Sequence, residues 1–145
     1  MIKLTWLTAL ALAMVVAVSS TLHAQTLQTG TWTGTAVGPD GSSEDVTFEV
    51  RAVPVWTRDG TRVVLAPPGS RVAASQLTIT YYSRRGLIPL RDIRLEGDTF
   101  SYEFSVGGGL DVTCSLTRQE DGSYTGPCGV GGGQGGRHTM RPPTG

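Results

Sequence analysis

Lysine is almost absent from this sequence, and histidine and cysteine are scarce. The one lysine is Lys3, so every later basic side chain is an arginine. Lys and Arg together number 12, as do Asp and Glu, and the formal net charge is +0. This balance excludes a strong overall attraction to nucleic acid or to anionic membranes. We therefore predict no nucleic-acid partner.

Only the first residues hold a long hydrophobic run. Met1 to Lys3 is a short positive start, Leu4 to Val18 is almost wholly apolar, and Ser19 to Ala24 is small and mostly polar. This order predicts a signal peptide over residues 1–24, cleaved after its last alanine. An apolar core of about 15 residues is shorter than the roughly 20 of a spanning helix, so we expect no membrane span in the mature chain. No cysteine lies near the cleavage point, which excludes a lipoprotein, and residues 25–145 form one periplasmic or secreted domain.

A helical hydrophobic period is also missing from the mature chain. Short segments instead alternate apolar and polar residues with a period of two, between turns rich in Gly, Pro, Asp and Ser. This pattern predicts an all-β fold, an antiparallel up-and-down barrel of about 8–9 short strands. Gln25 to Gln28 is predicted to be a loose lead-in. A barrel of this size holds a filled interior or one small ligand.

The clearest strand pattern surrounds the two cysteines. Glu120-Asp121-Gly122 is predicted to be a three-residue hairpin loop closed by Gln119 and Ser123. Counting back from that pair along both strands places Cys114 directly opposite Cys128. In an exported chain, two cysteines favour a disulfide over a metal or redox site. We therefore predict a Cys114–Cys128 disulfide between neighbouring strands.

A second hairpin is predicted between Ala52 and Leu65. With Asp59-Gly60 as a two-residue turn, Trp56 lies opposite Val63. A two-stranded ribbon that is apolar on both faces must be covered by something. Either it folds over the barrel mouth as a lid or it meets a partner. Trp56 and Val63 are therefore predicted contacts for a ligand or a partner.

The apolar faces of the other strands make either a packed core or a ligand cavity. Packing is the favoured interpretation, because these faces carry most of the aromatic residues. A cavity would instead make its lining residues the ligand contacts. Those candidates are Phe48, Ile79, Tyr102 and Phe104.

Residues for catalysis are scarce. His138 is the only histidine after the signal peptide, and a lone histidine near a chain end is predicted to be a surface or edge residue. A histidine-based triad would need a nucleophile and an orienting acid beside it. Carboxylates alone can cleave glycosidic bonds, but Glu44, Glu49 and Glu103 show no such pairing. With both cysteines oxidised, a metal site lacks ligands. We predict no catalytic residue, no metal, no cofactor and no enzymatic activity.

Gly30-x-Trp32 on the first strand precedes a meander of short strands with an arginine on the last one. This arrangement resembles the lipocalin and calycin barrels. In those families the tryptophan closes one barrel end and packs against an arginine from the final strand. The resemblance implies a pair of Trp32 with Arg137 or Arg141, held by a cation–π contact.

Short motifs spread over the mature chain are similar to a lipocalin-like exported bacterial module to which no catalytic residues are assigned. The motifs are Gly30-Thr31-Trp32-Thr33-Gly34, Gly86-Leu87-Ile88-Pro89-Leu90, Gly97-Asp98, Asp121-Gly122-Ser123-Tyr124-Thr125-Gly126 and Gly135. This second resemblance implies a lipocalin-like barrel and leaves the function open.

We expect an exported, non-enzymatic binding module. It would take a small apolar molecule in the barrel or a protein partner at the rim. Two alternatives stay open. One is a structural or envelope-associated interaction protein with a solid core. The other is a small secreted inhibitor of a protease or other hydrolase, which would use an exposed segment such as Arg51 to Thr61.

Overall fold

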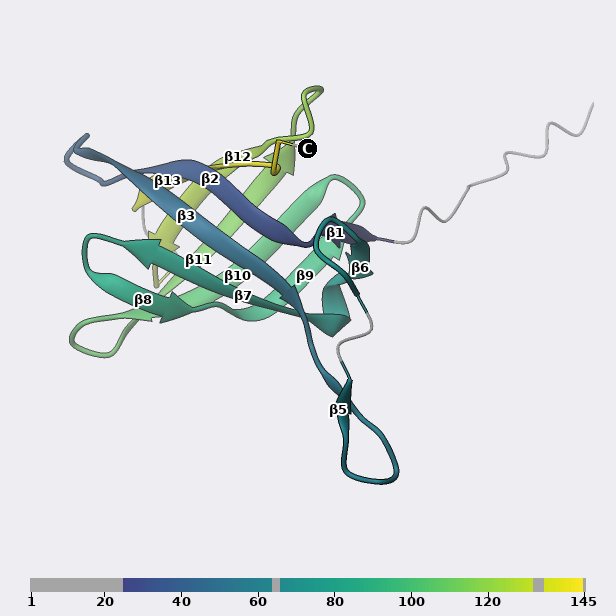
Figure 1. Ribbon diagram of the computed structural model, residues 1–145. Helices are drawn as coiled ribbons and strands as arrows, with labels where there is room; N and C mark the ends of the chain where they lie inside the picture. The colour runs from purple at the N-terminus through teal and green to yellow at the C-terminus, as the bar shows by residue number, and fades with distance from the viewer. Residues whose placement is uncertain (1–24, 64–65, 132–134, 145) are drawn as a thin grey trace, which may run out of the picture.

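The computed structural model describes residues 25–63, 66–131 and 135–144 (Figure 1). The predicted signal peptide lies outside these described residues. Apart from one short 3-10 helix, η1 (Ala74–Gln76), the regular elements that the structure describes are strands. None of the described helical segments is long and apolar enough to cross a membrane.

Nine antiparallel strands form the main sheet, in the order β8-β7-β3-β2-β13-β12-β11-β10-β9. Along most of them, buried residues alternate with more exposed ones. This arrangement of strands confirms the all-β prediction. The strands are β2 (Gly30–Val37), β3 (Ser43–Ala52), β7 (Leu77–Ser83), β8 (Gly86–Pro89), β9 (Arg91–Glu96), β10 (Thr99–Val106), β11 (Leu110–Arg118), β12 (Tyr124–Val130) and β13 (Gly136–Arg141).

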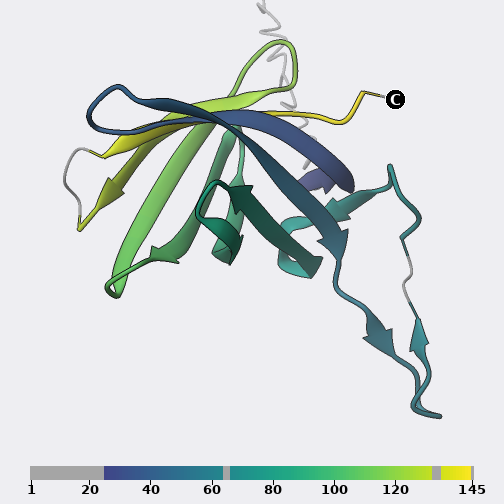
Figure 2. The ribbon, with the colours of Figure 1, turned by 60° about the vertical axis from the view of Figure 1, so that its left-hand side comes forward.

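The sheet curls into a nearly closed barrel, as Figures 1 and 2 show. The last strand, β13, returns to pair with β2, so strands from both ends of the described chain lie side by side. The open edges are β8 and β9, and these two are joined by Leu90 alone. The Leu90 N–H donates to the carbonyl of Ile79 on β7, at 2.9 Å. The chain itself therefore crosses the gap between these two edge strands, through Leu90.

One loop type joins three of the hairpins. In each, an Asp-Gly pair follows two residues of the loop, and the aspartate Oδ1 accepts a hydrogen bond from the backbone N–H two residues later. The glycine takes a positive φ, which it adopts without a Cβ clash. The three loops are Gly38–Ser42 between β2 and β3, Thr57–Thr61 in the small ribbon, and Gln119–Ser123 between β11 and β12.

The first corrected expectation is the register of the small ribbon. β4 (Val55–Trp56) pairs with β5 (Arg62–Val63), and Trp56 lies opposite Arg62 instead of Val63. The turn has three residues, because the Thr57 N–H donates to the Thr61 carbonyl. One extra loop residue moves the pairing by one position.

The second correction concerns the lead-in. Residues Thr26–Gln28 form β1, which pairs with β6 (Arg71–Ala73). In Figure 1 this small sheet lies on the right, at one end of the barrel. There Leu27 and Val72 are buried with Trp32, whose indole Nε1 donates to the Gln28 carbonyl at 2.9 Å. β1 and β6 thus close this end.

The Trp32–arginine pair is the third correction. Trp32 packs near the aromatic ring of Tyr124, with ring centroids 6.1 Å apart. Arg137 and Arg141 are exposed on β13, where Arg141 pairs with Thr33 and therefore points to the outer face. Trp32 points inward, so the pleat of the sheet separates it from both arginines.

The predicted disulfide is confirmed. Cys114 on β11 and Cys128 on β12 are direct partners in the ladder, with Cα atoms 4.1 Å apart. Both side chains are buried among the inward-facing aromatic residues.

Candidate functional site

The end of the barrel opposite β1 and β6 is open. We call it the mouth; its loops lie on the left of Figure 1. A pocket of about 560 Å³ enters the barrel there. Its walls are largely apolar and come from β7, β8, β10, β11 and β12: Tyr81, Ile88, Phe104, Val106, Leu110, Val112 and Val130.

Polar residues stand at the rim of this pocket. Ser42, Ser43 and Glu44 come from the start of β3 and the loop before it, and Arg84 and Arg85 from the β7–β8 turn. The guanidinium Nε of Arg84 lies 3.9 Å from Glu44 Oε2, and the Arg84 N–H donates to the same oxygen at 3.3 Å. Charge is therefore confined to the solvent-facing edge of the pocket.

His138 forms part of the inner end of the pocket. It lies on β13, is 5% exposed, and lines the pocket with Cys128. This corrects the prediction of a surface or edge histidine. The physical reason is the alternation along β13, where His138 and Met140 point inward while Arg137 and Arg141 are exposed. The sequence already contained this alternation, which could have identified His138 as an inward-facing residue. The position of His138 near the chain end pointed to the surface instead.

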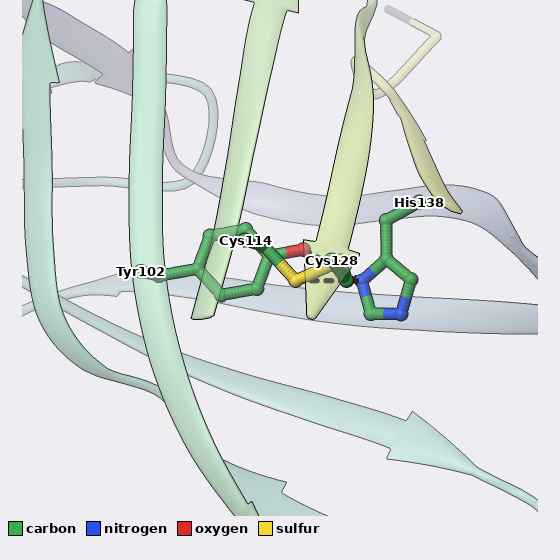
Figure 3. The surroundings of a disulfide bond; sticks show 4 residues. All are labelled: Tyr102, Cys114, Cys128 and His138. Atoms are coloured by element: carbon green, nitrogen blue, oxygen red, sulfur yellow. Dashed lines mark hydrogen bonds between the residues drawn. A yellow bond between two sulfur atoms is a disulfide. The ribbon is translucent and has the colours of Figure 1, made fainter. Parts of the chain in front are cut away.

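Four aromatic side chains surround the imidazole. The rings of Tyr81 and Phe104 are stacked near it, with centroids 5.3 Å and 5.7 Å away. Phe48 lies edge-on at 6.2 Å. The Tyr102 hydroxyl is 2.7 Å from His138 Nδ1, a hydrogen bond drawn in Figure 3. The imidazole is therefore held in place by packing and by one polar contact.

Burial sets the ionisation of this group. It lowers the pKa of His138 from 6.5 to about 4, because charging the ring would require desolvation in an apolar site. Burial and, secondarily, the charge of Glu44 raise the pKa of Tyr81 to about 12. Burial also raises the pKa of Tyr102 well above its usual value. At neutral pH all three groups are uncharged, so the inner end of the pocket is polar without carrying charge.

The disulfide lies beside the same histidine, as Figure 3 shows. Cys114 Sγ is 3.8 Å from His138 Nδ1, and the possible ligand atoms of Cys114, Cys128 and His138 lie within 4.8 Å of one another. Metal coordination by cysteine requires thiolates. The two sulfurs are bonded to each other, so the group in this state does not fit a thiolate-ligated metal.

Of the four residues predicted to contact a ligand inside the barrel, one lines the mouth pocket and three belong to the packed core. Phe104 lines the mouth pocket. Phe48, Ile79 and Tyr102 lie deeper, each at most 2% exposed, and pack as core. The interior is therefore filled at the closed end and open at the mouth. Sequence reasoning missed His138 as a member of this site.

The small ribbon stands apart from the mouth. It leaves the barrel after β3, at the end where Ala52 pairs with Leu77, and in Figures 1 and 2 it extends away from the barrel. The lid hypothesis is therefore wrong. Trp56 is 67% exposed and Val53 is also exposed, whereas Val63 is half-buried. At the base of the ribbon, a groove of about 650 Å³ runs over the outer face of β2, β3 and β7.

No known protein family, curated protein or solved structure matches the chain.

Proposed function

We propose that this chain is an exported, lipocalin-like barrel that binds a small apolar molecule in its mouth and catalyses no reaction. The observation that carries the proposal is the mouth pocket, with apolar walls and a charged rim, in a barrel whose other end is packed shut. Ligand sites are commonly concave and mostly apolar, with few polar groups, and this pocket falls within the usual volume range. The Cys114–Cys128 disulfide supports the exported location, since such bonds persist in oxidising compartments.

A fluorescence titration with N-phenyl-1-naphthylamine, a neutral apolar probe, tests the proposal. We expect saturable binding to the wild type. Val130→Trp places a large ring in the pocket wall and should weaken binding at least tenfold. Leu87→Trp is the matched control, because Leu87 is exposed on β8 and does not line the pocket. Equal weakening by both variants, or no binding to the wild type, would contradict the proposal.

Native mass spectrometry on protein purified from its host's exported fraction addresses the natural ligand. A bound small molecule would support the proposal, and its mass would begin to identify it. A second protein in the spectrum would favour the candidate described next.

The second candidate function is docking of a protein through the small ribbon. It is favoured by the exposed indole of Trp56 on a projecting ribbon and by the groove at the ribbon's base. Tryptophan is enriched at the energetic centres of protein interfaces. A hydrolase inhibitor acting through Arg51 to Thr61 would be one form of this function. Trp56→Ala should leave the fold intact and abolish capture of the partner from the exported fraction. Capture that persists in the folded Trp56→Ala variant would contradict this candidate.

A further inference from the structure

We propose that His138 donates a hydrogen bond from Nε2 to a neutral acceptor, such as a ketone or ester carbonyl, at the inner end of an apolar ligand. This inference rests on the proposed ligand binding and names the chemical class of the ligand. It assigns a binding role to a side chain that the sequence analysis placed at the surface.

The first step is the tautomer of the imidazole. Tyr102 is buried, and His138 Nδ1 at 2.7 Å is the one hydrogen-bond partner recorded for its hydroxyl among the described residues. If Nδ1 carried the proton, the Tyr102 hydroxyl hydrogen would be left without an acceptor in an apolar interior. Leaving a buried donor unpaired is costly. The hydroxyl therefore donates to Nδ1, and the ring proton lies on Nε2.

The second step is the direction of that proton. Within the described part of the chain, both hydrogen-bond contacts of His138 are made by Nδ1, and Nε2 has none. Every fully buried side-chain nitrogen or oxygen in this part of the chain does have a hydrogen-bond partner. Nε2 must therefore keep some exposure, and His138 lines the mouth pocket. The accessible space at this ring is the pocket. The Nε2–H group is thus a hydrogen-bond donor at the inner end of an apolar pocket.

The third step is the charge of the ligand group. Burial keeps the imidazole neutral at pH 7, because its pKa falls to about 4. An anion at the inner end would be desolvated there without a countercharge, because Arg84 and Arg85 lie at the exposed rim of the pocket. A neutral carbonyl needs only the hydrogen bond. The ring is also fixed in place by Tyr102, Tyr81 and Phe104, so the donor is oriented before the ligand arrives.

Nitrogen-15 NMR of the imidazole tests the tautomer without any ligand. The oxidised full-length chain is used, and comparison with a His138→Phe sample separates His138 from His23. We expect an unprotonated Nδ1 and a protonated Nε2 near pH 7. A protonated Nδ1 would overturn the proposal.

A pair of isosteric competitors tests the ligand class. 2-Acetylnaphthalene carries a ketone where 2-isopropenylnaphthalene carries a carbon–carbon double bond, and each displaces N-phenyl-1-naphthylamine. The measured quantity is the ratio of their affinities in each protein. The double variant Tyr102→Phe/His138→Phe keeps two aromatic rings but removes both the donor and the hydroxyl that depends on it. We expect the ketone preference to fall about tenfold, the value of one hydrogen bond.

Leu87→Trp is again the control. Leu87 is exposed on β8 and does not line the pocket, so this variant should keep the ketone preference within about twofold of the wild type. An unchanged preference in the double variant, with probe binding intact, would overturn the donor while leaving the proposed function in place. Absence of probe binding in the wild type would overturn both. If the double variant does not fold, the NMR result on the wild type decides the proposal.

Discussion

At one end of the barrel Trp32 is 3% exposed, whereas at the other Leu110 is 50% exposed. Both residues lie on barrel strands, so strand membership does not explain the difference. The closed end is covered by β1 and β6, two segments from outside the main sheet. In the described part of the chain, the mouth has only the hairpin turns of its own strands. Closing a barrel end therefore takes extra chain, and where none is supplied a pocket remains.

The largest predicted effect is a difference in the stability lost when a residue at each end is replaced with alanine. Trp32→Ala should reduce the free energy of unfolding by about 3–5 kcal/mol, because it empties a packed site and removes the hydrogen bond to Gln28. Leu110→Ala at the mouth should change it by less than about 1 kcal/mol. Guanidinium denaturation followed by circular dichroism measures both. Similar losses for the two variants would mean that the ends are equally packed.

The next prediction concerns the disulfide, whose Cys128 lines the mouth pocket. Replacing Cys114 and Cys128 together with alanine should cost about 3 kcal/mol, because the unfolded chain regains the entropy of a closed loop. Hydrogen exchange should rise most at the mouth ends of β11 and β12.

Thr117 and Thr125 make the matched control for the disulfide, since they form another direct pair between the same two strands. Their joint replacement with alanine should cost no more than about 1 kcal/mol. An equal cost for the two double variants would show that the disulfide adds nothing beyond ordinary pairing.

The smallest predicted effect is a pH dependence of stability that comes from His138. This residue lines the mouth pocket but is buried almost as deeply as Trp32 at the closed end. Its pKa is about 4 when folded and 6.5 as the ordinary value, so between these pH values the unfolded chain binds a proton that the folded chain does not. Stability should therefore be flat above pH 6.5 and fall below it, by about 2 kcal/mol between pH 7 and pH 5. Urea denaturation across this range measures the slope.

Other groups with shifted pKa values gain or lose their protons outside the range from pH 5 to pH 7. The neighbouring Tyr81 and Tyr102 have raised pKa values and stay neutral throughout. Hydrogen bonds to neighbouring side chains and backbone lower the pKa of Asp40, Asp59 and Asp121, so their contribution is lost only below pH 3.8. The Tyr102→Phe/His138→Phe variant should lack the slope. A slope that persists in that variant would assign it to other groups.

Much of the fold could be predicted because its information is local. The alternation along β10, β11 and β12 and the loop at Glu120 to Gly122 were enough to pair Cys114 with Cys128. The same counting failed in the ribbon, where Asp59-Gly60 suits a two-residue turn or the three-residue loop that forms. A single residue of loop length decides the register, and composition alone does not distinguish the two.

By itself, the sequence determined the all-β class, the meander order and the disulfide, because period-two patterns and turn residues act between neighbours in the chain. Tertiary structure decided which end of the barrel closes, that Trp32 meets Tyr124, and that His138 meets Tyr102 at a pocket. These contacts join residues far apart in the chain. They depend on how the sheet curls and where β1 and β6 settle, and no local pattern carries that information.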